Sequence, residues 1–370
     1  MAKQPQDKPP GAAKASRSGN PAVRATQPKP PPAPPRGSYR TPTAARRAPV
    51  QRRGQTRSLD VTEPNLPPDG ASYPQLLRGE EYARWRSVAG VVMGLSFFIL
   101  LTNLLSQFVV FLAWTLFGSA VPYPSYFAQA FAFERPSGML AANLGIATLI
   151  PVSCVLMMLL HRMQPAWLLS VQARVRWPYF LACLGVAVVA LNGVLLLSTL
   201  VSRPASFGPQ TGFWGFLIVI LLTAPIQAAA EEVFFRGYLM QALGSLFSRA
   251  WMGVVASALV FAFFHGTQNV PLFLDRFAFG LLSAVLVWRT GGIEASVAAH
   301  VVNNIFAYII AGLTTSIAAL KAVREIGWLD AVFDVGGFAV FAALALLVAV
   351  KLKPATRVQL AGLGRTTVVQ

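Results

Sequence analysis

The chain has 370 residues, of which 55% are hydrophobic and only 12% are charged, and its mean hydropathy is +0.54. Soluble domains carry about a quarter of charged residues, so this composition excludes an ordinary soluble domain and predicts a polytopic membrane protein. The net charge of +17 would suit a nucleic-acid partner, but thirteen Lys/Arg stand against one acid, Asp7, in residues 1–57 alone. Basic tails are typical of the cytoplasmic side of membrane proteins, and we therefore expect no nucleic-acid partner.

Three parts are predicted along the chain. Residues 1–85 form a cytoplasmic tail rich in Pro and Arg, which has too little apolar content to fold and is expected to be disordered. Residues 86–352 form the transmembrane domain, and residues 353–370 form a cytoplasmic C-terminal tail. No charged start followed by an apolar core stands near Met1, so we expect no cleavable signal peptide.

Long apolar segments fill the predicted transmembrane domain. A spanning helix needs about 20 such residues, and in lipid a single segment satisfies its backbone only as a helix. The sequence therefore predicts an all-α bundle of about eight transmembrane helices. The segments are 88–117, 139–160, 178–201, 213–237, 251–264, 271–288, 293–313 and 332–350.

The charges between the segments predict the orientation of the bundle, because Lys and Arg accumulate on the cytoplasmic side. A cytoplasmic N-terminus satisfies this rule across all eight segments, so we expect a multi-pass protein of the cell (plasma) membrane with both termini in the cytoplasm. The inner loops then carry Arg162, Arg174, Arg176, Arg249, Arg289, Lys351, Lys353, Arg357 and Arg365. The outer loops carry Glu134, Arg135, Arg203, Asp275, Arg276, Lys321, Arg324, Glu325 and Asp330.

The stretch QAAAEEVFFRG, residues 227–237, closes one of the apolar segments. Ionisable groups inside a membrane segment cost several kcal/mol and normally mark a functional or paired site. Glu232 and Arg236 are four residues apart on one helix face, which predicts a structural ion pair. Glu231 lies about 100° round the helix, on the face of Gln227, so its carboxylate remains free for another partner.

Three histidines are candidate partners for this carboxylate. His161 directly follows an apolar run and is interpreted as a helix-end residue. His265 ends the apolar run 251–264, which is only about 20 Å long as a helix and too short to span the membrane. We therefore expect the chain to turn there inside the membrane, next to a wet pocket that opens toward the cytoplasm. His300 shares a helix face with Asn304, one turn later.

Together these residues predict a hydrolytic site with water as the nucleophile. Glu231 can act as a general base toward water, and His265 beside it can hold the same water or carry the proton. His300 and Asn304 can present two hydrogen-bond donors to a developing oxyanion. A single intramembrane histidine is often only a helix contact, but the combination on three nearby helices favours a site. Phe261, one turn before His265, is a candidate pocket wall.

The motifs EExxxR at 231–236, FxxxH at 261–265 and HxxxN at 300–304 stand in this order along the chain. They resemble the three motifs of the CAAX-protease and bacteriocin-processing (CPBP, or Abi) family of intramembrane proteases. The resemblance covers residues 206–313, and the earlier segments match only in number and hydrophobicity.

The resemblance implies an intramembrane endopeptidase that cleaves a membrane-associated peptide or protein within the lipid bilayer. By similarity, Glu231 and His265 would activate the water, and His300 and Asn304 would form the oxyanion hole. Gln227 would contribute to the pocket. Members are often called metalloproteases, and Glu231, His265 and His300 could hold zinc; we favour catalysis that requires no cofactor.

Two other classes of function compete with the peptidase. A catalytically silent membrane scaffold or immunity protein would keep the fold, but it would not need this polar set. A proton-coupled transporter would use Glu231 and Arg236 as proton-relay groups, and it predicts inverted repeats with broken helices in matching halves. The sequence has no such symmetry.

Overall fold

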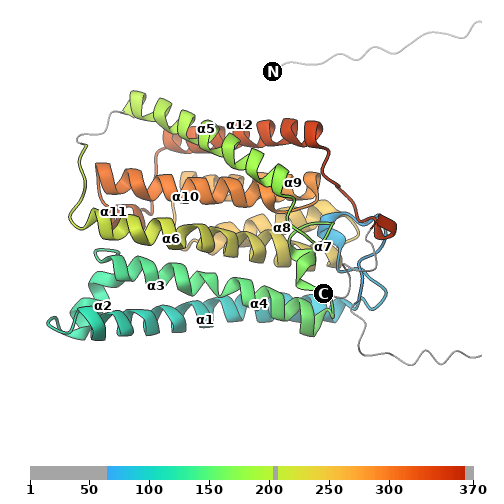
Figure 1. The fold of residues 1–370 in the computed structure, drawn as a ribbon, viewed down its shortest axis with the longest axis horizontal. Helices are drawn as coiled ribbons and strands as arrows, with labels where there is room; N and C mark the ends of the chain where they lie inside the picture. Colours follow the sequence, from blue (N-terminus) through green and yellow to red (C-terminus); the bar gives the residue numbers. More distant parts are fainter. Residues whose placement is uncertain (1–64, 203–206, 363–370) are drawn as a thin grey trace, which may run out of the picture. The chain divides into compact units, whose positions relative to one another are not determined.

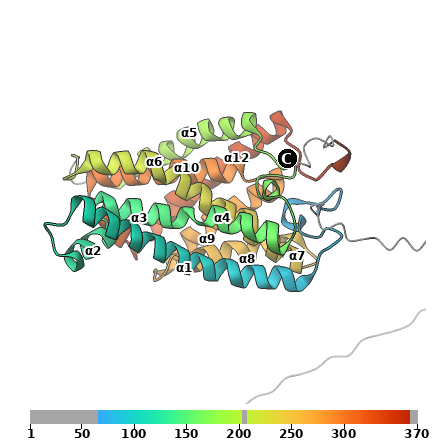
Figure 2. The same ribbon diagram turned by 60° about the horizontal axis from the view of Figure 1, so that its bottom comes forward.

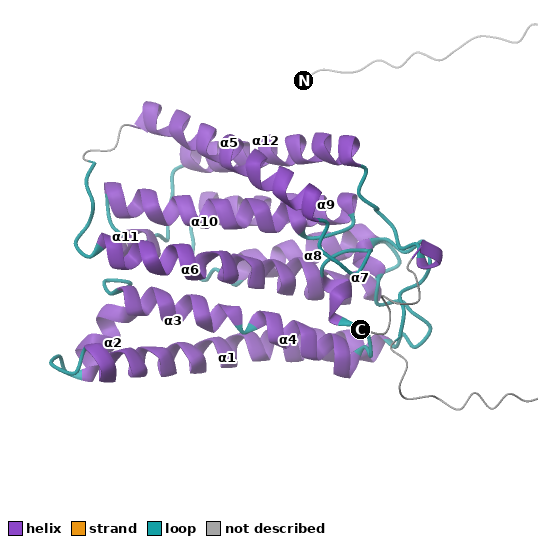
Figure 3. Ribbon diagram, in the orientation of Figure 1, coloured by secondary structure: helices purple, strands orange, loops and turns teal. Residues whose placement is uncertain are grey.

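The computed structural model describes residues 65–202 and 207–362, which belong to one compact unit, Asp60–Gln370. In these residues the secondary structure consists of helices and two isolated β-bridges (Figure 3). The predicted all-α fold is therefore confirmed. The helices are η1 (Tyr73–Gln75), α1 (Arg84–Phe117), α2 (Tyr123–Phe131), α3 (Pro136–Ala147), α4 (Leu149–Val155), η2 (Leu156–Leu160), η3 (Pro165–Leu168), α5 (Trp177–Ser202), α6 (Phe213–Glu232), η4 (Val233–Leu239), α7 (Met240–Leu246), α8 (Ala250–Phe263), α9 (Val270–Thr290), α10 (Glu294–Thr314), α11 (Ile317–Ala322), α12 (Trp328–Leu352) and η5 (Leu360–Gly362).

The predicted polytopic architecture is also confirmed. In the described ranges, seven helical stretches have the length and composition to cross a membrane, and α8 is a shorter apolar helix of 14 residues. Each of the eight predicted apolar segments coincides with one of these eight stretches. The seven long stretches are Arg84–Phe117, Pro136–Leu160, Trp177–Ser198, Phe213–Leu246, Val270–Thr290, Glu294–Thr314 and Trp328–Leu352.

The helices pack in a closed ring whose order differs from the order along the chain. Around the ring, α1 packs on α3, α3 on α6, α6 on α10, α10 on α5, α5 on α12, α12 on α9, α9 on α8, α8 on α7 and α7 on α1. Figures 1 and 2 show the helix axes running in roughly the same direction. The stretch Phe213–Leu246, which joins α6, η4 and α7, crosses from one side of the ring to the other. Its middle is therefore surrounded by protein.

Residues 65–82 cover one end of the bundle. Tyr73, Leu76 and Leu77 are almost completely buried there, and the Tyr73 hydroxyl donates a hydrogen bond to the Leu168 carbonyl. Each buried side chain of this size contributes about 1.5–3 kcal/mol of transfer free energy. The segment is thus an ordered part of the transmembrane domain.

The predicted boundaries of the two tails are consequently wrong at their inner ends. Val358 pairs its backbone with Gly70 and Ala71, and the Leu360 amide donates to the Asp69 carboxylate at 3.0 Å. A few apolar side chains are enough to order this segment because they pack against the folded helix bundle. Local amino-acid composition does not reveal this packing surface. The rest of both predicted tails, 1–64 and 363–370, lies outside the described residues.

A buried ion pair connects three segments at the same end of the bundle. Two nitrogens of the Arg176 guanidinium, Nε and Nη2, contact the Glu294 carboxylate at 2.7 and 2.5 Å, and Nη1 donates to the carbonyls of Thr290 and Ala355. These contacts join the start of α5, the start of α10 and the segment after α12. The sequence indicated Arg176 only as a loop charge, although Glu294 stands at the edge of an apolar segment, where an acid needs a partner.

Candidate active site

The motif stretch 227–237 lies at the centre of the long crossing helix. Residues Val233–Leu239 adopt a π-helical turn, η4, in which all seven residues are buried. Such turns are rare in proteins, and those that do occur are often found at functional sites. The geometry places both glutamates of the motif inside the ring.

Glu232 and Arg236 form the predicted ion pair. Arg236 Nη1 donates to Glu232 Oε1 at 2.8 Å, and both side chains are at most 1% exposed. The guanidinium also lies over the ring of Phe261, 4.0 Å from its centroid, and faces Phe279 at 5.3 Å. The charge is therefore stabilised by one carboxylate and two aromatic faces.

His300 bridges the two glutamates. Its Nδ1 lies 2.7 Å from Glu232 Oε1, and its Nε2 lies 3.4 Å from Glu231 Oε2. With the Nδ1 hydrogen donated to Glu232, the ring is fixed so that Nε2 faces Glu231. Glu232 thus has a second contact that helical spacing could not reveal, because spacing relates residues of one helix and His300 belongs to α10.

Gln227 and Asn304 meet between α6 and α10. The Asn304 amide donates to the Gln227 side-chain carbonyl at 2.9 Å, and Gln227 also contacts the Glu231 carboxylate. The expected common face of Gln227 and Glu231 is therefore present, and it faces α10. Next to Asn304, Asn303 donates to its side-chain oxygen at 3.3 Å.

His265 reaches this cluster from the turn after α8. Its Nδ1 donates to the Phe261 carbonyl at 2.8 Å, and its ring packs on the Phe261 ring with 4.6 Å between centroids. The same Phe261 ring faces His300 at 6.3 Å. In the described residues no hydrogen bond or ion pair joins His265 to Glu231. The predicted end of the helix at His265 is confirmed, since α8 stops at Phe263.

The donor set expected for zinc does not fit a metal ion in this geometry. Within residues 65–202 and 207–362, no group of three or more His, Cys, Asp or Glu side chains is placed to hold one. His300 Nδ1 is already bonded to Glu232, which leaves Glu231 and His300 Nε2 as a pair, and His265 stands apart from them.

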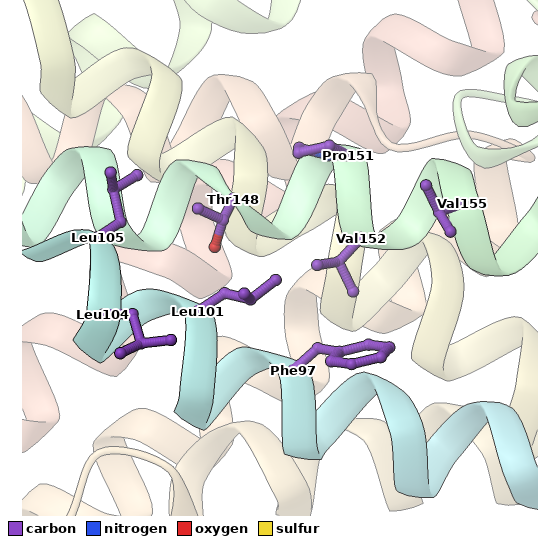
Figure 4. A pocket seen from close by; sticks show the side chains of 8 residues that line it. All are labelled: Phe97, Leu101, Leu104, Leu105, Thr148, Pro151, Val152 and Val155. Carbon is purple, nitrogen blue, oxygen red and sulfur yellow. The ribbon is translucent and has the colours of Figure 1, made fainter.

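A large apolar groove of about 610 Å³ lies outside the polar cluster, between α1 and α4. Figure 4 shows its lining side chains, which include Leu101, Leu104 and Pro151. Leu104 is 55% exposed, so the groove lies on the lipid-facing surface. None of the predicted site residues lines this groove.

Aromatic side chains pack between α1 and the polar cluster. On α1, the ring of Phe98 stacks on the ring of Phe264, with 5.1 Å between centroids.

A second cavity, of about 500 Å³, lies between α5, α9, α10 and α12. We call it the polar cavity and define it by five of its lining residues: Asn192, Ser198, Arg276, Asn303 and Asp334. It extends toward α11, at the end of the bundle opposite to residues 65–82 (Figure 1). His265 does not line this cavity, so it is not the wet pocket expected beside that residue, which stays a prediction.

Two of the charges that line the polar cavity, Asp275 and Arg276, were expected in an outer loop. Asp275 and Arg276 lie inside α9, in its second turn, and Asp334 lies in α12. Their positions within apolar segments were the available signal, because ionisable residues there normally serve a site or a partner.

Comparison with known proteins gives one family and one relative. The family described as type II CAAX prenyl endopeptidase Rce1-like matches residues 212–306. An uncharacterized protein, YyaK, of Bacillus subtilis (strain 168) is 32% identical over 116 residues, which cover 29% of this chain and 39% of the relative. The match thus spans well under half of that relative, and no solved structure matches the chain. Residues 212–306, which hold all three motifs, thus match the Rce1-like family model, and the resemblance of this region to CAAX-type proteases is confirmed.

Proposed function

We propose that the chain is an intramembrane endopeptidase of the CAAX-protease type, which hydrolyses a peptide bond of a membrane-associated peptide or protein. The observation that carries the proposal is the contact of Glu231 and Glu232 with one imidazole, His300, inside a membrane-spanning bundle. A bilayer makes such a cluster costly, and the family match over residues 212–306 supports peptidase chemistry for it.

In the proposed reaction, Glu231 takes a proton from a water molecule whose oxygen attacks the scissile carbonyl carbon. The carbonyl oxygen becomes an oxyanion, to which the Asn304 amide and His300 Nε2 can donate hydrogen bonds. His300 donates from Nε2 only while that nitrogen carries a proton, and the nearest source is Glu231, 3.4 Å away. When the C–N bond breaks, this proton passes to the leaving amine, and the products are a carboxylic acid and an amine.

Two neighbouring residues prepare this chemistry. Glu232 holds the His300 ring through Nδ1, which directs Nε2 toward Glu231. His265, which packs on the same Phe261 ring as Arg236, supplies a second imidazole from the turn after α8. We propose that it holds the attacking water, as the resemblance implies.

We further propose that the reaction needs no metal ion and that the protein lies in the cell membrane with both termini in the cytoplasm. The first proposal is supported by the placement of the side chains in the described residues, where no group of three or more His, Cys, Asp or Glu could hold a metal ion. The second is supported by the distribution of Lys and Arg between the predicted loops.

The variant Glu231→Gln tests the proposed function, because it removes the base and changes little volume. We expect purified Glu231→Gln protein to insert and melt like the wild type but to leave membrane peptides uncut. Membrane proteomics of wild-type and Glu231→Gln strains, read for shifted C-termini, would identify the substrates. Cleavage by the purified variant at the wild-type rate would show that Glu231 is not the base.

A further inference from the structure

Four helix ends meet at one buried ion pair, at the end of the bundle that residues 65–82 cover (Figure 1). The Arg176 guanidinium contacts both oxygens of Glu294, at the start of α10. Its Nη1 also donates to the carbonyls of Thr290, at the end of α9, and Ala355, just after α12. Arg176 itself directly precedes α5, so one buried side chain holds the four helix ends together. We call this place the Arg176 junction and define it by residues 174–177, 289–294 and 351–355.

Four exposed cations surround this ion pair. Arg174 stands in the loop before α5, Arg289 in the last turn of α9, and Lys351 and Lys353 at the end of α12. The acid of the junction is Glu294, which is buried and has both oxygens engaged by the arginine. In the described part of the chain, no ion pair includes any of the four cations. The surface of the junction is therefore strongly positive and has no accessible acid of its own.

The backbone adopts an uncommon conformation at two of these cations. Lys353, the residue that caps α12, has a φ of 49°, and Ala173, directly before Arg174, has a φ of 53°. Residues other than glycine seldom adopt this left-handed region, because it brings their Cβ atom close to the backbone. Such outliers are often found where a binding site requires them. Both segments thus turn sharply where they carry a cation.

Apolar side chains continue from the cations along the lipid-facing surface of α5 and α12. Trp177, the first residue of α5, is exposed, and so is Leu181 one turn later. On α12, Leu347 is exposed as well. The Tyr179 hydroxyl donates to the Ala345 carbonyl, so the two helices lie side by side at this level. Exposed tryptophan at the end of a spanning helix is typical of the level of the lipid headgroups.

We propose that the Arg176 junction binds the headgroup of an anionic phospholipid, with the phosphate between Arg174, Arg289 and Lys353. Guanidinium and ammonium groups donate charge-assisted hydrogen bonds to a phosphodiester, and basic pockets at the ends of spanning helices recognise such headgroups. The acyl chains would follow the exposed apolar surface of α5 and α12, which a soluble phosphate would leave unused. The bound lipid would connect α5, α9 and α12 from outside, as the buried arginine does from inside.

Two simpler roles are available to the same charges. Cations at the C-terminal ends of helices interact favourably with the helix dipole, which applies to Arg289 and Lys353. Arg174 precedes α5, so it gains nothing from that dipole. Cations on one side of a membrane also set the orientation of a protein, a role that depends on their number and not on a ligand. A measurement of lipid binding therefore separates the proposed site from both roles.

The test is native mass spectrometry of the purified full-length protein in detergent, with phosphatidylglycerol, phosphatidylcholine or inorganic phosphate added. We expect the wild type to bind phosphatidylglycerol at least tenfold more tightly than phosphatidylcholine. The variant Arg174→Gln/Lys353→Gln should bind phosphatidylglycerol roughly 30-fold more weakly, because each cation near a membrane surface contributes about fivefold. Lys353→Gln alone, which leaves the loop before α5 unchanged, should lose about fivefold.

The matched control is Arg84→Gln/Arg162→Gln, which removes two exposed arginines from the same end of the bundle, beside α1 and η2. It lowers the net charge equally and should bind phosphatidylglycerol like the wild type. An equal loss of binding in both double variants would overturn the inference, because net charge alone would then attract the lipid. Equal binding of both phospholipids by the wild type would also overturn it. Inorganic phosphate that binds with the same dependence on Arg174 and Lys353, in place of the lipid, would overturn it in favour of a soluble ligand.

The unfolding temperature gives a second measurement. Phosphatidylglycerol should raise it in the wild type and in Arg84→Gln/Arg162→Gln, because a ligand that binds only the folded protein stabilises it. The increase should be absent in Arg174→Gln/Lys353→Gln, whose unfolding temperature in lipid-free detergent should match that of the wild type. A wild-type increase that phosphatidylcholine produces equally would contradict the site. Neither measurement uses peptidase activity, so the inference stands or falls apart from the proposed function.

Discussion

At the scale of single residues, the notable feature is that one imidazole connects an ion pair to the proposed base. Glu232 Oε1 accepts from both Arg236 Nη1 and His300 Nδ1, while His300 Nε2 faces Glu231. The negative charge of Glu232 therefore has two structural roles. It compensates a buried arginine, and it fixes the orientation of the histidine that meets Glu231.

The variant Glu232→Gln should affect both uses. It leaves Arg236 buried without its counter-ion, a loss that costs roughly 3–5 kcal/mol, so we expect a lower unfolding temperature in detergent together with loss of activity. A melting curve that coincides with the wild-type curve would contradict the pairing.

A double variant, Glu232→Leu/Arg236→Leu, separates the two uses. Removing both charges should restore much of the stability, because no uncompensated charge remains. Activity should stay absent, because His300 Nδ1 has lost its acceptor. Recovery of activity in this double variant would show that Glu232 serves Arg236 alone.

The sequence predicted residue pairs within one helix better than pairs between helices. Glu232 and Arg236 were predictable because i,i+4 spacing fixes a shared face. The contact of Glu232 with His300 was not predictable, since it depends on how α6 and α10 are placed in the ring. The roles of Glu231, His265, His300 and Asn304 remain predictions.

At the scale of elements, the end of η2 meets the crossing helix through a histidine. His161 is 4% exposed, and its Nε2 lies 3.1 Å from the Tyr238 hydroxyl in η4. Burial, and to a smaller extent the Arg86 charge, lowers the pKa of His161 from 6.5 to about 4. The folded protein therefore holds this imidazole neutral.

This pKa shift predicts a pH-dependent stability. Above pH 6.5 the ring is neutral in the folded and unfolded chain, and its full contribution to stability is present. As the pH falls from 6.5 toward 4, the unfolded chain binds a proton that the folded protein does not, so stability is lost, by at most roughly 3 kcal/mol. We expect a smaller loss over this range in His161→Gln, measured by thermal unfolding in detergent. If the unfolding temperature falls equally with pH in both proteins, the lowered pKa of His161 is contradicted.

Element positions followed from apolar length, whereas local irregularities did not. Each long apolar segment forms a helix because, in lipid, its backbone N–H and C=O groups must hydrogen-bond within the segment. The π-helical turn of η4 and the order of residues 65–82 depend on tertiary packing, and neither has a local sequence signal. The ring order of the helices could not be predicted from periodicity either, because periodicity shows which face of a helix is apolar and not which helix packs against it.

At the scale of the whole molecule, the arrangement of donors predicts metal-independent catalysis. We expect purified protein to keep its activity in 1,10-phenanthroline, with bound zinc counted by mass spectrometry well below one per chain. Binding of zinc at a fixed site would require its ligands in deprotonated form. Stoichiometric zinc, with activity lost on chelation and restored by adding zinc back, would reverse this prediction.

The short α8 has a consequence for the surrounding bilayer. Its 14 residues extend over about 21 Å, whereas a hydrocarbon core is about 30 Å thick. Trp251 and Phe263, near its two ends, are 46% and 67% exposed and so face the lipid. Hydrophobic mismatch of this size thins the adjoining leaflet, which brings the interfacial region toward His265. Proteolysis should therefore be fastest in vesicles of short acyl chains and slowest in long ones, because a thicker bilayer resists this local thinning; the same rate at every chain length would contradict the link.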